Sequence, residues 1–101
     1  MISRTIGSVV LLSLAFSGTA MAQAADPVVL AQSCASCHGV DGKGVQGGTI
    51  PPINGRAAAA MATQMKGYKA DQPAVTMMNR LAKGYTDAEI DAIAAYYANI
   101  K

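Results

Sequence analysis

The pattern of apolar and polar residues is most regular in the last sixteen or so positions of the chain. Four apolar residues there recur at i, i+3, i+4 and i+7, on one face of a helix: Ile90, Ile93, Ala94 and Tyr97. The stretch Thr86-Asp87-Ala88-Glu89 just before them has the form of a capping box. The pattern therefore predicts a helix that begins after Thr86 and ends near Asn99.

Three further helices are expected: Pro27 to Ser36, Arg56 to Lys66, and Asp71 or Gln72 to about Lys83. Asp26 is a suitable N-cap for the first, with proline at the first helical position. Gly67 and Gly84 are expected to end the other two. Between the first two helices, residues 39 to 56 hold eight glycines and prolines, which predicts a long loop. No convincing strand pattern occurs, so the predicted fold class is all-α.

The first 22 residues have the layout of a secretory signal peptide. Arg4 supplies a positive charge, Ile6 to Phe16 is an apolar run, and Ala20-Met21-Ala22 is a small-x-small cleavage site. The apolar run is too short to span a bilayer roughly 30 Å thick. We expect residues 1–22 to be removed and residues 23–101 to form one exported domain, without a membrane span.

Composition limits what this domain can do. It lacks Trp, and much of its apolar content is alanine, so a core of this size needs a staple, metal or cofactor. The charge is nearly balanced, which gives no polybasic footprint of nucleic-acid binding. Residues 43 to 83 nevertheless hold six basic residues against the single acid Asp71. That excess either steers an acidic partner or is an ordinary solvated surface.

The candidate chemistry lies in Cys34-Ala35-Ser36-Cys37-His38, which holds both cysteines and the only histidine. A structural disulfide, a thioredoxin-like dithiol, a zinc site and covalent haem attachment are the four interpretations. A dithiol motif normally sits in a strand–helix setting, and zinc wants a fourth ligand. The C-x-x-C-H spacing favours haem: Cys34 and Cys37 form thioethers, and His38 is directed at the iron. One covalent haem c would also supply the missing interior.

A six-coordinate iron would need a second ligand, and a methionine thioether is the expected type. The candidates are Met61, Met65, Met77 and Met78, of which at least two should simply pack in the core. Chain length from His38 favours the later pair, without deciding between them.

The chain downstream of residue 22 resembles the class I c-type cytochromes, of the cytochrome c4 and c553 kind. The similar segments are CASCHGVDGKG, PPINGR and LAKGYTDAEIDAIAAYYANIK. The stretch VTMMNRLAKGYTDAEI is similar to the cytochrome subunit of flavocytochrome c sulfide dehydrogenase, although better-known subunits of that enzyme have two haem domains. The resemblance implies three to five helices wrapped around one haem, with the first and last helices crossing at Tyr97 and nearby alanines.

The resemblance also implies roles for individual residues. The family's axial methionine lies seven residues before the position of Tyr85, which selects Met78, with Met77 as second choice. The match of Pro51 to the family's loop proline implies that its carbonyl accepts from the His38 ring. The implied function is periplasmic one-electron transfer by a protein that is not itself an enzyme, with a sulfide-oxidising flavoprotein as donor. A free shuttle to an oxidase or reductase is the alternative. A five-coordinate, gas-binding haem protein is less favoured, because in those bundles C-x-x-C-H lies near the C-terminus.

Overall fold

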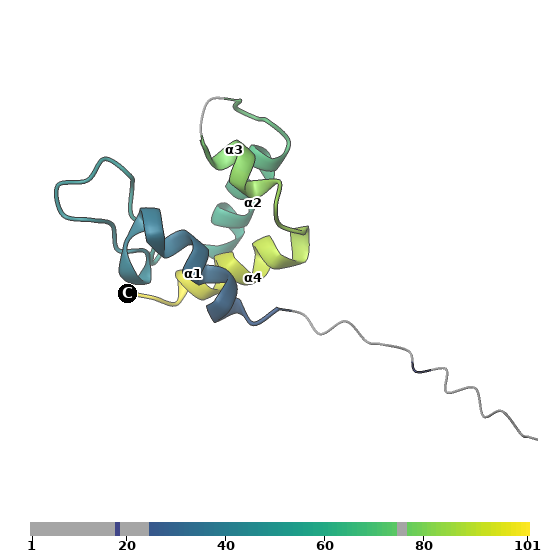
Figure 1. Ribbon diagram of the computed structural model, residues 1–101, viewed down its shortest axis with the longest axis horizontal. Coiled ribbons are helices and arrows are strands. Elements are labelled where there is room, and N and C mark those ends of the chain that lie inside the picture. Colours follow the sequence, from purple (N-terminus) through teal and green to yellow (C-terminus); the bar gives the residue numbers. More distant parts are fainter. Residues whose placement is uncertain (1–17, 19–24, 75–76) are drawn as a thin grey trace, which may run out of the picture.

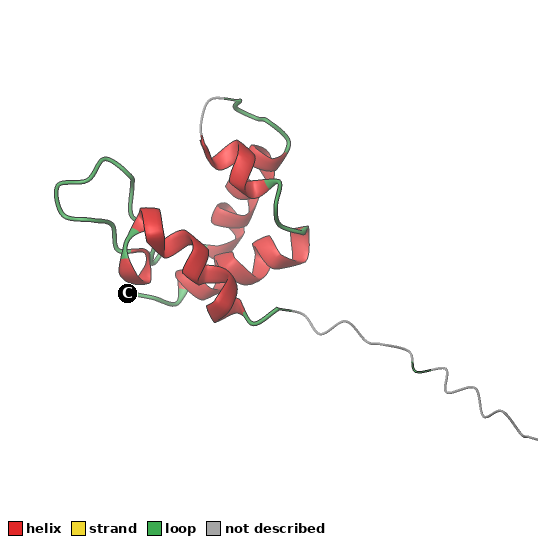
Figure 2. Cartoon of the chain, viewed as in Figure 1, coloured by secondary structure: helices red, strands yellow, loops and turns green. Residues whose placement is uncertain are grey.

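The computed structural model describes residue 18 and residues 25–74 and 77–101, which contain α-helices, one short 3₁₀ helix and no strand (Figures 1 and 2). The elements are α1 (Pro27–His38), η1 (Val40–Gly42), α2 (Ala58–Lys69), α3 (Met77–Ala82) and α4 (Asp87–Ala98). The predicted all-α class is confirmed. Within these ranges, no helix combines the length and apolar character needed to cross a membrane. The predicted signal peptide lies outside the described residues, apart from residue 18.

Local side-chain chemistry explains where α1 and α4 begin. The Asp26 carboxylate accepts from the amide of Val28 at 2.8 Å, which caps α1 as predicted. At α4 the Thr86 hydroxyl accepts from the Glu89 amide at 3.1 Å, and the Glu89 carboxylate accepts from the Thr86 amide at 2.9 Å. Two of the helix's unpaired amide groups are thus satisfied, and the predicted capping box is confirmed.

The predicted end of the second helix at Gly67 is wrong, since α2 continues to Lys69. Gly67 is absent from the glycines with positive φ in the described chain, so it does not form a left-handed cap. Its missing side chain serves a different purpose. The chain turns back after α2, the Gln72 amide donates to the Gly67 carbonyl at 2.8 Å, and a Cβ on Gly67 would lie 3.0 Å from the Gln72 carbonyl oxygen.

The predicted third helix also begins too early. Residues 71–74 are not helical, and Asp71 has φ +59°, outside the right-handed helical region. The segment that Pro73 was expected to start is instead the turn that closes the end of α2. Residues 75 and 76 lie outside the described chain, and α3 begins at Met77.

Helix α4 organises the packing, with α1 and α2 both packed against it and α3 packed on α2 (Figure 1). The predicted apolar face of α4 is entirely buried. Ile93, Ala94 and Tyr97 form one cluster with Ala31 of α1 and Met61 of α2. Ile90 forms a second cluster with Met65 and Ala82. These two small clusters, rich in alanine and methionine, are the core that positions the site.

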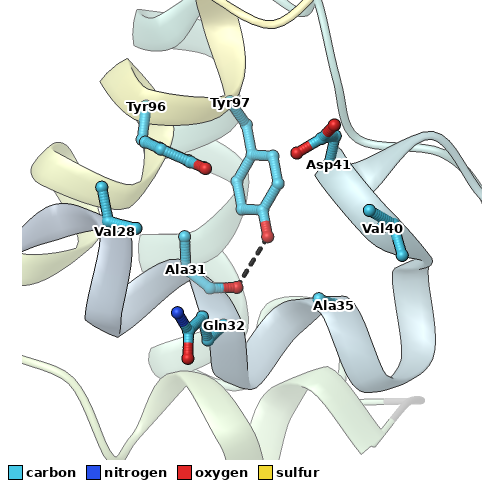
Figure 3. A pocket seen from close by; sticks show the side chains of 8 residues that line it. All are labelled: Val28, Ala31, Gln32, Ala35, Val40, Asp41, Tyr96 and Tyr97. Atoms are coloured by element: carbon cyan, nitrogen blue, oxygen red, sulfur yellow. Dashed lines mark hydrogen bonds between the residues drawn. The ribbon is translucent and has the colours of Figure 1, made fainter.

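The close crossing of α1 and α4 is confirmed at Tyr97 (Figure 3). The Tyr97 ring lies over α1, and its hydroxyl donates to the Ala31 carbonyl at 2.7 Å. Ala31 and Ala94 are almost fully buried, and their small side chains let the two helices approach. A groove beside this crossing is lined by residues such as Val28, Val40 and Tyr96. Neither cysteine nor His38 lines it, so it is separate from the C-x-x-C-H motif.

Candidate functional site

Both cysteines lie in the last two turns of α1, three residues apart and therefore on the same side of the helix. Both thiols are free, with Cys34 half-buried and Cys37 exposed. Burial is the largest influence on the Cys34 thiol and raises its pKa, so this thiol stays protonated at neutral pH. A catalytic dithiol needs a thiol with lowered pKa. The environment of Cys34 therefore fits a covalent anchor better than a redox dithiol.

His38 is the last residue of α1, and the backbone turns sharply after it. Gly39 has φ +85°, and a Cβ at this position would overlap the carbonyl oxygen of Gly44. The Gly44 amide donates to the His38 carbonyl at 2.7 Å, which closes the turn. Only glycine combines this backbone conformation with such a close approach. The turn brings the following loop back beside the His38 ring.

The His38 ring meets the carbonyl oxygen of Pro51, which lies 2.7 Å from Nδ1. A carbonyl only accepts, so Nδ1 is the donor, and the neutral ring in this tautomer offers the Nε2 lone pair to a metal. The loop that delivers Pro51 is held just after this residue, by bonds to Gly42 and to Tyr97 of α4. The amides of Ile53 and Asn54 donate to the Gly42 carbonyl at 2.7 and 3.1 Å, and the Gly55 amide donates to the Tyr97 carbonyl at 2.9 Å.

The four candidate methionines lie in three environments: buried, half-buried and exposed. Met61 and Met65 are buried in the two core clusters, in keeping with a packing role. Met77 is 66% exposed, whereas Met78 is half-buried and packs against the second cluster. A bound haem would cover exposed side chains of α3 as well, so this difference in exposure does not decide between the two residues, and Met78 stays a prediction.

Tyr85 connects the surroundings of Met78 to those of the cysteines. Its ring packs against both core clusters, and its hydroxyl is hydrogen-bonded to the hydroxyl of Ser33, the residue before Cys34. The segment that follows α3 is thereby joined to the end of α1. In the sequence, Tyr85 marks only the position from which Met78 is counted, and no pattern marks Ser33. The aromatic position before a capping box was the available indication of this contact.

The arrangement fits a covalently bound haem. Large apolar side chains that a flat apolar ring could cover remain exposed on the loop and on α3, including Ile50 at 44% and Leu81 at 48%. The described residues contain no group of three or more His, Cys, Asp or Glu side chains that could bind a metal ion alone. Zinc therefore lacks a ligand set there. Two thiols on one side of a helix, followed by a histidine whose Nδ1 donates to a carbonyl, match the donor chemistry of haem c.

The basic segment, residues 43–83, has several of its positive charges paired with acidic side chains. Lys66 and Lys69 of α2 form ion pairs with Asp91 and Asp87 of α4, at 2.8 and 3.2 Å. Lys83 pairs with Asp71 at 2.6 Å. Three of the six basic residues between 43 and 83 thus have acidic partners. Two of these partners, Asp87 and Asp91, lie outside the segment. The excess charge available to steer an acidic partner is correspondingly smaller.

A helical domain with C-x-x-C-H at the end of its first helix and a Nδ1-anchored histidine belongs to the class of c-type haem proteins. The family follows from comparison: the model for "Cytochrome c" matches residues 22–101. The chain therefore belongs to the cytochrome c family, as a class I c-type cytochrome with one covalently bound haem c.

Relatives of this chain within the family are named as cytochromes or as electron acceptors. The chain is similar to the cytochrome subunit of sulfide dehydrogenase from Chlorobaculum tepidum, with 38% identity over 92 residues, 85% of this chain and 82% of the relative. It is similar to cytochrome c-553 from Nitratidesulfovibrio vulgaris, with 36% identity over 93 residues, 87% and 88% of the two chains. It also matches the thiosulfate dehydrogenase electron acceptor of Stutzerimonas stutzeri, with 34% identity over 71 residues, 66% of this chain and 32% of the relative. The protein is thus an electron carrier rather than an enzyme.

Proposed function

We propose that this chain is a periplasmic one-electron carrier whose haem is attached through Cys34 and Cys37 and whose iron is bound by His38 and Met78. The observation that carries this proposal is the 2.7 Å contact between Nδ1 of His38 and the Pro51 carbonyl. A ligand histidine commonly has its second nitrogen fixed in this way, which sets the ring and raises its basicity.

The chain's residues have separate tasks in this proposal. The haem supplies an iron that alternates between Fe(II) and Fe(III). Cys34 and Cys37 would hold the haem covalently, and His38 and Met78 would both bind its iron, which would leave no position for a substrate. A thioether ligand also favours the reduced iron relative to a second histidine. The protein then transfers electrons without making or breaking bonds in a substrate.

An optical redox titration of the intact protein tests this function. The expected result is a single one-electron step, with low-spin spectra at both ends and a ferrous spectrum that carbon monoxide leaves unchanged. A high-spin ferrous spectrum that shifts with carbon monoxide would instead identify a five-coordinate, gas-binding protein.

For the partner, we propose a flavoprotein that oxidises sulfide, with this chain as its cytochrome subunit. The support is the 38% identity to the Chlorobaculum sulfide dehydrogenase subunit over most of both chains. A free shuttle is the second candidate, supported by the similarity to cytochrome c-553. Purification from the native periplasm separates the two. A flavoprotein that co-elutes and reduces the haem when sulfide is added supports the subunit role, and elution as a lone cytochrome supports the shuttle.

Export is part of the same proposal, with residues 1–22 as the cleaved signal peptide. N-terminal sequencing of the periplasmic protein is expected to begin at Gln23 or within about three residues of it. A mature protein that begins at Met1 would contradict cleavage.

A further inference from the structure

Asn79 follows Met78 directly and is the one polar residue that is buried in the described parts of the chain, at 6% exposed. Asparagine is an unfavourable residue inside a helix, because its side chain competes for backbone hydrogen bonds. Helix α3 has only six residues, too few to be stable without tertiary support. An asparagine buried in so short a helix must therefore be stabilised by contacts with other parts of the fold.

The reason is visible in its hydrogen bonds. The Asn79 side-chain nitrogen donates to the Tyr68 carbonyl at 3.0 Å and to the Pro73 carbonyl at 2.7 Å. Tyr68 lies in the last turn of α2, and Pro73 lies in the turn that follows it. Both amide hydrogens thus join α3 to the end of α2, beside which α3 lies (Figure 1).

We propose that Asn79 is a positioning residue for the axial methionine. Its amide ties the turn after α2 to the first turn of α3, and this fixes the direction in which Met78 faces. The inference rests on the proposed ligand role of Met78. In this proposal the orientation of Met78 depends on the Asn79 side chain, and not only on the formation of α3.

The other polar link across the same turn is a weaker candidate. The Lys83–Asp71 ion pair is 2.6 Å long, but both side chains are half exposed. Exposed pairs of this kind contribute little, because water and salt screen them. The Asn79 side chain is buried, and loss of its donor removes a hydrogen bond from the Pro73 carbonyl and one from the Tyr68 carbonyl, which still accepts from the Asp71 amide at 3.0 Å. Asp71→Asn is therefore a matched control that perturbs the same turn from its surface.

The test is imidazole binding to the ferric, haem-loaded protein, which requires that Met78 leave the iron. Asn79→Asp has nearly the same size but replaces the donor with a carboxylate. We expect imidazole to bind about 30-fold more tightly to this variant, the equivalent of ~2 kcal/mol at 1.4 kcal/mol per tenfold. The far-red sulfur-to-iron band should weaken in parallel. Asn79→Ala is the second variant if the aspartate variant does not fold, and it should shift imidazole affinity in the same direction.

Two controls separate a positioning role from general destabilisation. Asp71→Asn and Tyr97→Phe, which removes a hydrogen bond in the other core cluster, should leave imidazole affinity within about threefold of the native value. The proposal is overturned if Asn79→Asp does no more than these controls. Met78→Ala separately tests the proposal that Met78 binds the iron. If this variant keeps the far-red band, that ligand assignment fails. If it loses the band while the Asn79 variants bind imidazole as the native protein does, only the role of Asn79 fails.

Discussion

Replacing Gly42 with alanine is expected to disturb the loop that brings Pro51 to His38. Gly42 is buried, has φ +67°, and its carbonyl accepts from the amides of Ile53 and Asn54. A Cβ at this position would lie 2.7 Å from two ring carbons of Tyr97 and 2.8 Å from Cγ1 of Ile53. These distances are shorter than van der Waals contact, and the Tyr97 ring is fully packed in the core, at 1% exposed.

The cost has two parts. A side chain in the left-handed region costs about 1–2 kcal/mol, and overpacking in a filled core costs about 1–3 kcal/mol more. Together they predict a loss of about 2–5 kcal/mol in the free energy of unfolding. Gly47→Ala isolates the first part, since Gly47 has a similar φ of +75° but nothing within 4 Å of its would-be Cβ.

The assay is guanidinium unfolding of the haem-loaded variants, followed by far-ultraviolet circular dichroism. The difference between the Gly42 and Gly47 variants measures the close approach to Tyr97, and we expect about 1–3 kcal/mol. Equal losses in the two variants would refute the reasoning, because backbone strain alone would then account for both.

Two further variants test the helix contacts. Burial raises the pKa of Tyr97 to about 12, from an ordinary value of 10. The folded protein therefore retains a proton that the unfolded chain loses, and stability is full below pH 10 and falls by about 3 kcal/mol as the pH rises to about 12. Tyr97→Phe should remove this alkaline loss, as seen in unfolding curves at each pH; an unchanged pH dependence would assign it elsewhere. Thr86→Ala should cost about 1 kcal/mol by removing the cap of α4, and no loss in guanidinium unfolding would contradict that role.

Those parts of the fold that depend on neighbouring residues were predictable from the sequence. The capping box at Thr86 and the apolar face from Ile90 to Tyr97 involve residues within one or two turns of each other, and both appear as expected. The N-cap at Asp26 is equally local. The C-x-x-C-H motif is likewise read from five consecutive residues.

Features that depend on distant residues were not predictable. Gly67 is a plausible helix end by itself, but the turn back to Gln72 makes it an interior helix residue. The partners of Asn79 are backbone carbonyls, which every residue carries, so no sequence pattern marks them. The basic segment could be counted, yet the pairing of Lys66 with an acid on another helix could not.

The central claim, that Met78 is the second ligand of the haem iron, is tested most directly by the ferric visible spectra of Met78→Ala and Met77→Ala. Met78 is half-buried beside the core, and Met77 is 66% exposed. The far-red sulfur-to-iron band is predicted to disappear in Met78→Ala and to persist unchanged in Met77→Ala. A band that survives in Met78→Ala and disappears in Met77→Ala would contradict the account.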